Sequence, residues 1–388
     1  MTNRAIRYRI YPTTEQATMF LKTFGCCRKV WNLMLADKTK SYVETKSFGT
    51  QTPAMYKDAY PYLREVDSLA LANVQQNLQS AFRNCFDKNR KARNKFPKFK
   101  SAKHSRKSYT TNNQNYGNGK PGTVAVIGNC IKLPKVGLVK AKIHKRAEDG
   151  WIIKSATVSR ESDGRYYVSV LYEFEQSVAQ VPVSDNAIGL DYKSDGLYMD
   201  SNGNVGSQHK YYRESQEKLK RAQRRLSRKV GSEKGVPKSK NWLKQQNKVN
   251  RIHTKIANQR KDTLHKLSTE IANQYDVVCV EDINMRDLSN EGFGNGKATM
   301  DNGYGMFLNM LIYKLQDRGK YLVVVDKWFP SSQLCHNCGT RYPKMKNLSA
   351  RTLVCEKCGL VIDRDLNAAI NIKQEGLRIL SSQSQATA

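Results

Sequence analysis

Four cysteines near the carboxyl end constrain this chain more than any other feature. Cys335 and Cys338 form one Cys-x-x-Cys pair, and Cys355 and Cys358 form a second pair after sixteen intervening residues. Two such pairs are typical of a structural zinc site, because four thiolates complete the tetrahedral coordination of one Zn²⁺ ion. The spacing therefore predicts a zinc ribbon over residues 331–360 with one structural Zn²⁺ and no coordination position left open.

Three acidic residues occupy comparable places in the second half of the chain. Asp191 ends a predicted apolar strand at 187–192, Glu281 ends another at 275–281, and Asp365 begins a predicted helix directly after the cysteines. Because the carboxyl ends of strands in an open sheet meet at one edge, these carboxylates are expected to converge. A strand hairpin, a helix, a parallel strand and a closing helix, in this order, predict an RNase H-like fold.

Three carboxylates in one dry site repel one another unless cations accompany them. We therefore expect two Mg²⁺ ions, which prefer carboxylate, water and phosphate oxygens as ligands. A pair of such ions activates a water molecule and stabilises the leaving oxygen, so the expected reaction is phosphodiester hydrolysis.

Each of these acids also has a structural explanation. Asp191 is suited to cap a turn, Glu281 to pair with a basic helix, and Asp365 to cap a helix. Their joint position at the ends of elements favours one catalytic site over three separate structural roles. Asp363 is a weaker candidate, because the start of the predicted helix directs Asp365 into the expected cleft.

The chain is strongly basic, which limits the classes of partner that it can have. Its 388 residues contain 66 Lys and Arg against 34 Asp and Glu, for a formal net charge of +32. This excess predicts a polyanionic partner. Nucleic acid is favoured over an anionic membrane, because no apolar run approaches the ~18–20 residues of a membrane span. The first residues lack the apolar core of a signal peptide, so an intracellular protein is expected.

Two segments concentrate the basic charge and are expected to contact phosphates. Residues 88–107 hold ten Lys or Arg and no acid, and residues 210–261 hold eighteen against three acids. A solvated linker is the alternative for the first segment, but bound anions relieve like charge of this density. The predicted contacts are Lys95, Lys98, Lys100, Lys103, Arg106, Lys107, Arg221, Arg224, Arg225 and Arg228.

The hydrophobic pattern predicts an α+β multidomain protein. Three-to-four spacing predicts helices after residue 14, period-two alternation predicts a small β-barrel or curled sheet, and strands and helices alternate after residue 187. The predicted divisions are a first β strand at 1–12, a helical lobe with a basic linker at 13–107, a β domain at 108–180, a nuclease domain at 181–330 and 361–380, the zinc ribbon inserted at 331–360, and a disordered tail at 381–388.

Several longer strings resemble those of one known family. They are RYRIYPT at 7–13, KFPKFKS at 95–101, IKLPKVGLVK at 131–140, GLDYKSDG at 189–196, KIANQRKD at 255–262, VCVEDIN at 278–284, and the block that joins both cysteine pairs to DRDLNAA. In this order, and over nearly the whole length, they resemble the transposon-encoded TnpB family, the compact relatives of type V CRISPR effectors.

The resemblance implies an RNA-guided DNA endonuclease, in which a noncoding guide RNA pairs with double-stranded target DNA beside a short flanking motif. It implies that Asp191, Glu281 and Asp365 form a RuvC-like triad with magnesium; nuclease-dead relatives lose triad residues, and this chain keeps all three. It also implies a helical recognition lobe and a wedge-like β domain. A monomeric protein is expected, located in the cytoplasm of a prokaryotic cell and associated with the nucleoid when it is bound to DNA. The side chains expected to read the flanking motif are Tyr56, Gln76, Gln79 and Ser80.

Other functions are compatible with parts of this pattern. A guide-independent RuvC-type resolvase or transposase would use the same three acids, but it would not need 180 residues of helix and basic β structure at the amino end. A zinc-ribbon DNA-binding regulator, an RNA-guided repressor or an accessory factor that escorts nucleic acid would bind without cleaving. The complete set of three acids favours an active enzyme over these binding functions.

Overall fold

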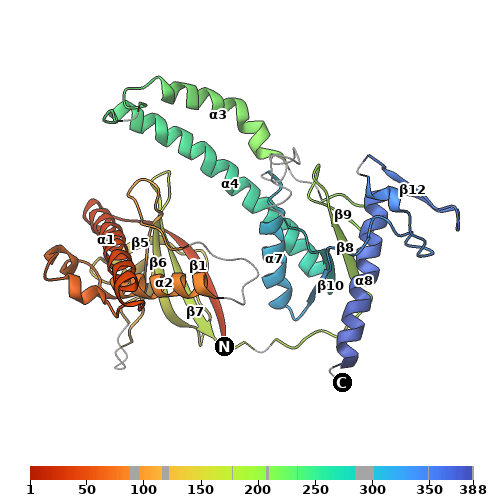
Figure 1. Cartoon of the computed structure of the whole chain (residues 1–388), viewed down its shortest axis with the longest axis horizontal. Helices are drawn as coiled ribbons and strands as arrows, with labels where there is room; N and C mark the ends of the chain where they lie inside the picture. Colours follow the sequence, from red (N-terminus) through yellow and green to blue (C-terminus); the bar gives the residue numbers. More distant parts are fainter. Residues whose placement is uncertain are drawn as a thin grey trace. The chain divides into compact units, whose positions relative to one another are not determined.

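The computed structural model describes residues 1–87, 96–115, 122–176, 178–206, 209–233, 235–284, 301–347 and 349–386. They divide into two compact units, Met1–Gln176 and Ser177–Ala388, which are described one at a time (Figure 1). Within these residues, none of the helices combines the length and the apolar character that crossing a bilayer requires.

A seven-stranded antiparallel sheet forms the framework of the first unit, in the order β2-β6-β7-β1-β5-β4-β3. The strands are β1 (Thr2–Tyr11), β2 (Lys107–Asn112), β3 (Ala125–Ile127), β4 (Cys130–Leu133), β5 (Gly137–Lys142), β6 (Ile152–Arg160) and β7 (Tyr166–Phe174). The amino-terminal strand β1 is central, because it pairs with β7 on one side and with β5 on the other. Among the described strands β2 and β3 form the two edges of this sheet, for which the sequence predicted a small β-barrel or a curled sheet.

Two helices pack on this sheet, α1 (Thr14–Thr45) and α2 (Ser68–Phe86), with short 3-10 helices between them at Pro53–Tyr56 and Pro61–Arg64. Buried side chains of the helices and the sheet form one hydrophobic cluster, in which the rings of Phe20 and Phe24 lie against Tyr109 of β2. The helical lobe and the β domain, which the sequence divided near residue 107, therefore share one core. The division is wrong because the apolar stripe of each helix is buried against the apolar face of the sheet.

The second unit is built on a four-stranded sheet in the order β11-β10-β8-β9. Its strands are β8 (Ala187–Tyr192), β9 (Tyr198–Asp200), β10 (Val277–Glu281) and β11 (Tyr321–Val325). β8, β10 and β11 are parallel, whereas β9 pairs with β8 as an antiparallel hairpin. The central strands are apolar along their whole length because helices cover both faces of the sheet.

Helices α4 (Lys240–Gln274) and α7 (Tyr304–Gln316) share one hydrophobic cluster with the sheet, and α8 (Arg364–Ala386) shares a second one. α8 packs closely against the backbone of β8 and against the Cys279 side chain of β10. A Cβ atom added to Gly189 of β8 would lie 2.1 Å from the carbonyl oxygen of Ala369, and one added to Gly376 of α8 would lie 2.3 Å from Sγ of Cys279. These two glycines therefore fix the position of α8 on the sheet.

The carboxyl end differs from the expectation of a disordered tail at 381–388. α8 continues to Ala386, although the sequence from Ser381 onward has few apolar residues. Once a helix is nucleated, each further residue adds a hydrogen bond at little cost. The buried side chain of Leu380 anchors the turn from which this extension grows.

Candidate functional site

The three predicted catalytic acids lie on elements that pack directly against one another. β8 and β10 are neighbouring parallel strands that pair Leu190 with Val280, so the next residues, Asp191 and Glu281, lie side by side. Asp365 lies in the first turn of α8, which packs on both strands. We refer to Asp191, Glu281 and Asp365 as the carboxylate cluster.

The acids of this cluster affect one another electrostatically. The pKa of Asp191 is raised well above its ordinary value, first by burial and then by the negative charges of Glu281 and Asp365. The pKa of Glu281 is raised from 4.5 to about 7, mainly by burial and further by Asp282. Burial together with Asp191 and Glu281 also raises the pKa of the Tyr304 hydroxyl. The cluster therefore carries more buried negative charge than the described side chains around it neutralise.

Basic side chains reach the cluster from two directions. Nζ of Lys193 lies 2.9 Å from Oδ2 of Asp365, and Nη1 of Arg351 lies 3.9 Å from the same oxygen. Lys193 and Arg364 oppose the rise in the pKa of Asp191. The sequence reasoning missed Lys193, although it stands two residues after Asp191 in the string GLDYKSDG.

Other acids near the cluster have structural partners. Oδ1 of Asp363 accepts hydrogen bonds from the backbone N–H groups of Asp365 and Leu366, at 2.9 and 3.0 Å, and so caps α8. This capping supports the choice of Asp365 over Asp363, because the cap occupies the Asp363 carboxylate and fixes the turn that carries Asp365. Asp195 forms an exposed ion pair with Lys210 at 2.6 Å.

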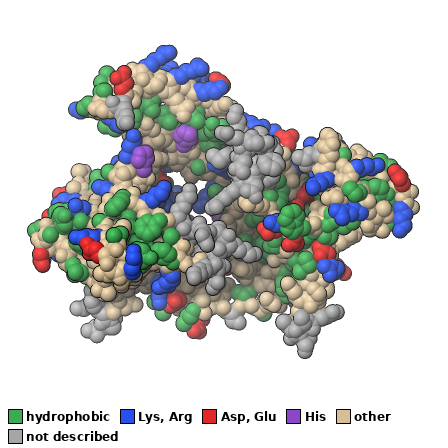
Figure 2. Space-filling model, in the orientation of Figure 1, with side chains coloured by type: hydrophobic (Ala, Val, Ile, Leu, Met, Phe, Trp, Pro, Cys, Tyr) green, Lys and Arg blue, Asp and Glu red, His purple; other side chains and the backbone are tan. Residues whose placement is uncertain are grey.

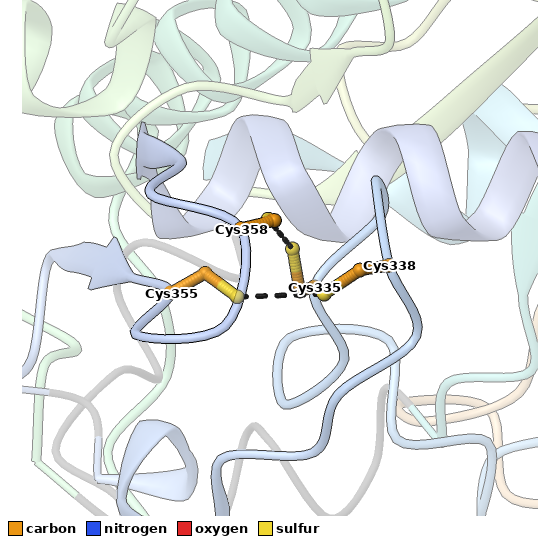
Figure 3. Close-up of side chains that lie close together, drawn as sticks. All are labelled: Cys335, Cys338, Cys355 and Cys358. Carbon is orange, nitrogen blue, oxygen red and sulfur yellow. Dashed lines mark hydrogen bonds between the residues drawn. The ribbon is translucent and has the colours of Figure 1, made fainter.

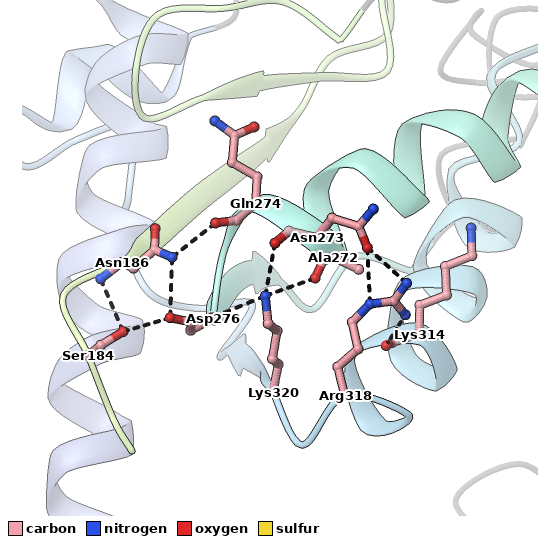
Figure 4. A network of polar contacts seen from close by, with 9 residues as sticks. All are labelled: Ser184, Asn186, Ala272, Asn273, Gln274, Asp276, Lys314, Arg318 and Lys320. Atoms are coloured by element: carbon pink, nitrogen blue, oxygen red, sulfur yellow. Dashed lines mark hydrogen bonds and ion pairs between the residues drawn. The ribbon is translucent and has the colours of Figure 1, made fainter. Parts of the chain in front are cut away.

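An acid at the opposite end of the same strands shows the contrasting case. Asp276 directly precedes β10 and accepts hydrogen bonds from Lys320, Asn186 and Ser184 (Figure 4). These bonds, with that of Lys320 the largest contribution, lower the pKa of Asp276. Lys320 also donates to the last carbonyl groups of α4 and so ties the helix to the sheet. Asp276 thus has the hydrogen-bonded environment and the lowered pKa of a structural acid, whereas the pKa values of Asp191 and Glu281 are raised.

The four predicted zinc ligands converge on one point. The ligand atoms of Cys335, Cys338, Cys355 and Cys358 all lie within 4.8 Å of one another, and the two loops that carry them face each other (Figure 3). Among the described residues, these cysteines are the group of three or more His, Cys, Asp or Glu side chains that lie close enough to hold one metal ion. The three acids of the carboxylate cluster do not meet the same distance criterion.

The two cysteine loops are built alike. In each loop the N–H of a glycine, Gly339 or Gly359, donates 2.8 Å to the carbonyl of the first cysteine, and both glycines have φ near +72°. Strands β12 (Thr352–Val354) and β13 (Val361–Asp363) pair around the second loop. The Tyr342 hydroxyl donates to Sγ of Cys355 and is the main cause that lowers the pKa of this thiol to about 6. A thiolate is the form that binds metal.

Two buried asparagines of α8 join the cysteine loops to the carboxylate cluster. The side-chain amides of Asn367 and Asn371 each donate 2.7 Å to the carbonyl of Leu334, just before the first cysteine. Oδ1 of Asn367 also accepts the backbone N–H of His336 at 3.1 Å. Because Asn367 is two residues from Asp365, α8 holds both sites in a fixed relation. The sequence reasoning did not single out these residues in DLNAAIN.

A second candidate surface is a pocket within the first unit, between α1, α2 and β2. Its lining includes four cationic and two amide side chains, and no acid of the described residues lines it. We refer to it as the basic pocket; these six residues are Arg28, Asn73, Asn77, Lys100, Arg106 and Lys107. The side-chain amide of Asn32 accepts a hydrogen bond from the backbone N–H of Lys100 and donates one to its carbonyl. Nζ of Lys100 lies 3.6 Å from the ring centroid of Trp31. The pocket is therefore both positively charged and held in place.

The predicted nucleic-acid contacts of the first unit divide around this pocket. Lys100, Arg106 and Lys107 line it, Lys98 and Lys103 are exposed outside it, and Lys95 lies outside the described residues. Gln76, Gln79 and Ser80 are exposed on α2 but do not line it, and the hydroxyl of Tyr56 donates to Asp37. The polar residues that α2 does turn toward the pocket, Asn73 and Asn77, were missed because only the packing of β2 shows which side of the helix borders it.

The basic helices of the second unit form a hairpin in which α3 (Tyr211–Ser227) lies beside α4 (Figure 1). The side-chain amide of Gln245 joins them by donating 2.9 Å to the carbonyl of Ala222. Lys and Arg side chains follow both helices (Figure 2). Arg221 and Arg225 line a hollow between the helices with Lys218, Lys248 and Arg251, whereas Arg224 and Arg228 are exposed elsewhere.

Three family models match separate parts of the chain. Residues 1–47 match a model described as a helix-turn-helix domain, residues 169–291 match one described as "Probable transposase", and residues 304–372 match one described as a Cas12f1-like TNB domain. In this structure residues 2–45 form β1 and the single long helix α1. The third match spans the cysteine loops, both asparagines and Asp365.

Relatives cover almost the entire chain. A protein of Streptomyces pristinaespiralis named "Putative RNA-guided DNA endonuclease" is 36% identical over 385 residues, which are 96% of this chain and 89% of the relative. The Escherichia coli K12 protein InsQ, with the same description, is 29% identical over 97% of this chain and 93% of its own length. The fold resembles that in a cryo-EM structure of a Cas12f1–sgRNA–target DNA complex, at a TM-score of 0.58, with 14% identity and coverage of 96% and 98%. With these matches, the chain belongs to the transposon-encoded TnpB family, the compact relatives of type V CRISPR effectors.

Proposed function

We propose that this protein is an RNA-guided DNA endonuclease that hydrolyses phosphodiester bonds at the carboxylate cluster. The observation that carries the proposal is that the negative charges of Glu281 and Asp365 raise the pKa of Asp191. Acids from three distant segments therefore meet at one place without sufficient neutralising charge. The names of the two full-length relatives support the same activity.

The cluster fits magnesium as its resident cofactor. Carboxylate oxygens are the ligands that Mg²⁺ prefers, and the raised pKa values of Asp191 and Glu281 fit a site whose negative charge a cation would balance. We propose that Asp191, Glu281 and Asp365 hold two Mg²⁺ ions, which when bound supply an activated water and stabilise the leaving 3′ oxygen.

The protein's own residues position the parts of this site. Lys193 and Arg351 hold the carboxylate of Asp365, and the cap formed by Asp363 fixes the turn below it. The close contact of α8 with Gly189 keeps the helix that carries Asp365 at a fixed distance from β8.

We propose that the four cysteines hold one structural Zn²⁺ ion. Four converging thiols, of which Cys338 and Cys355 have a lowered pKa, form the closed ligand set of a structural zinc site. Through Asn367 and Asn371 the metal would stiffen the support of Asp365 rather than take part in hydrolysis.

Guide RNA and double-stranded target DNA are the proposed partners of a monomeric protein. The α3–α4 hairpin fits the phosphates of structured RNA, which proteins recognise by shape and backbone charge. The basic pocket fits the DNA that flanks the target, because its cations can hold phosphates while the amides of Asn73 and Asn77 can meet base edges. The Asn residues replace Gln76, Gln79 and Ser80 as the proposed readers of the flanking motif.

A plasmid library with a randomised flank tests the proposed function. The protein would be co-expressed with the RNA encoded at the 3′ end of its own gene, beside Asp191→Ala and, as a matched control, Asp195→Asn. Loss of plasmids that share one flank, abolished by Asp191→Ala but not by Asp195→Asn, is expected. Cleavage that ignores the guide would indicate a resolvase, and bound RNA without cleavage would indicate an RNA-guided binding protein.

A further inference from the structure

Trp328 has the most exposed aromatic side chain among the described residues. It is 80% exposed, whereas Trp31 is 8% exposed and the other two tryptophans are partly covered. Leaving an indole in water forgoes the favourable burial of one of the largest apolar side chains. Such exposure beside a candidate active site points to a ligand that covers the ring.

The position of Trp328 places it at the same sheet edge as the carboxylate cluster. Val325, the last residue of β11, pairs with Glu281 of β10, and the two strands are parallel. Three residues of extended chain reach at most about 10 Å, and neighbouring strands lie about 4.8 Å apart. The Cα atom of Trp328 therefore lies within roughly 15 Å of that of Glu281, a distance that about five stacked nucleotides span.

The turn that carries Trp328 is firmly held. The side chain of Asp326 accepts the N–H of Trp328 at 2.8 Å, and its carbonyl accepts the N–H of Phe329 at 3.0 Å. Phe329 packs against the hydrophobic cluster beneath α8. Anchoring on both sides fixes the backbone that carries the indole, which lowers the entropy cost of stacking on it.

The neighbouring charge favours a nucleic acid as the occupant. Nζ of Lys327 lies 4.9 Å from the centroid of the Trp328 ring. An aromatic face beside a cation offers stacking for a base and an ion pair for the adjoining phosphate, which is how proteins hold single strands. Bases within a duplex are already stacked on their neighbours, so an exposed ring suits an unpaired base.

We propose that Trp328 is a stacking platform for an unpaired base of the DNA strand held at the carboxylate cluster, with Lys327 on the adjacent phosphate. This inference rests on the proposed function, because that function brings a single strand to this edge. Trp328 is thereby a positioning residue, which orients the strand without contacting the reacting atoms.

Tryptophan fluorescence tests this directly and without cleavage. The full chain carrying Asp191→Ala, purified with its RNA, would be titrated with an oligo(dT) strand while indole emission is followed. Stacking quenches the emission of the ring involved. We expect quenching in this background and in a matched Trp151→Phe variant, which changes a partly covered ring of the first unit that stacks on Phe174. Trp328→Phe should lose most of the quenching but keep the affinity within about threefold, since phenylalanine also stacks.

The second readout is affinity, and it separates stacking from a structural role. Trp328→Ala should weaken oligo(dT) binding about tenfold, within the range expected for one stacked base, and circular dichroism and RNA content should not change. In the active protein, Trp328→Ala should raise the target concentration for half-maximal cleavage more than it lowers the maximal rate. Quenching that survives in Trp328→Phe, or unchanged affinity in Trp328→Ala, would overturn the proposal. Because binding is measured without cleavage, either result stands apart from the outcome of the plasmid library.

Discussion

Replacing Glu281 by glutamine should stabilise the magnesium-free protein while it abolishes cleavage. In the folded protein the pKa of Glu281 is about 7, against 4.5 for the ordinary side chain. This rise in the pKa corresponds to a destabilisation of the folded protein, when Glu281 is charged, of at most about 3.4 kcal/mol. Solvent screening reduces this figure because the carboxyl group is partly exposed, and we expect about 1–2 kcal/mol. Glutamine keeps the shape of the side chain and removes the charge.

The size of this effect depends on pH in a defined window. Between pH 4.5 and 7 the folded protein retains a proton on Glu281 that the unfolded chain releases, so stability falls as pH rises through this range. At pH 8 the wild type therefore carries the full cost of the buried charge, and at pH 5 it carries little. We expect Glu281→Gln to raise the melting temperature of the second unit by about 2–8 °C at pH 8 and to change it little at pH 5.

Thermal unfolding followed by circular dichroism measures both effects. The buffer would lack magnesium but contain no chelator, because a chelator would also remove zinc from the cysteines. Glu270→Gln, an exposed change on α4, is the matched control and should leave the melting temperature unchanged at both pH values. Added Mg²⁺ should stabilise the wild type and not the Glu281→Gln variant. A variant no more stable than the wild type at pH 8, or equally stabilised at pH 5, would refute the reasoning.

Three further predictions concern residues of the second unit. Gly189→Ala should abolish most cleavage and lower the melting temperature, because the new methyl group collides with the backbone of α8, whereas Gly305→Ala, with open space around it, should be tolerated. Cys355→Ser should lose the bound zinc, measured by metal analysis of the purified protein, and Cys130→Ser should retain it. Burial lowers the pKa of Lys314 from 10.5 to about 8, so between these pH values the unfolded chain binds a proton that the folded protein does not. The free energy of unfolding of the wild type, relative to that of Lys314→Met, should therefore rise by up to about 3 kcal/mol as pH increases from 8 to 10.5. Denaturant titrations measure this difference.

Local patterns were sufficient to predict the strands and helices that carry the candidate site. The apolar runs ending at Asp191 and Glu281 became the parallel strands β8 and β10, because strands covered on both faces are apolar along their length. Each Cys-x-x-Cys pair lies on a short loop closed by a glycine turn, and β12 and β13 pair around the second loop, so that all four ligand atoms converge. In both cases the information lies within a few residues of the side chains concerned.

The residues that were missed act through contacts between distant segments. Lys193 reaches Asp365 across 172 positions of sequence, and Asn371 reaches Leu334 across 37. Nothing near either residue indicates its partner. The division between the helical lobe and the β domain failed for the same reason, since the contacts of Phe20 and Phe24 with Tyr109 are visible only after the chain has folded.

The two ends of the second unit's sheet show what distinguishes a candidate catalytic acid from a structural one. Both Asp276 and Asp191 lie where a strand meets its flanking loop or turn, and burial alone would raise the pKa of each. At Asp276, hydrogen bonds from Lys320, Asn186 and Ser184 outweigh burial and lower the pKa. At Asp191, the nearest strong influences besides burial are two more acids, and Lys193 and Arg364 only partly oppose them. A fold selected for stability alone would gain by pairing Asp191 as it pairs Asp276. Under the proposed function, the charge that balances the cluster would come from bound magnesium rather than from the chain.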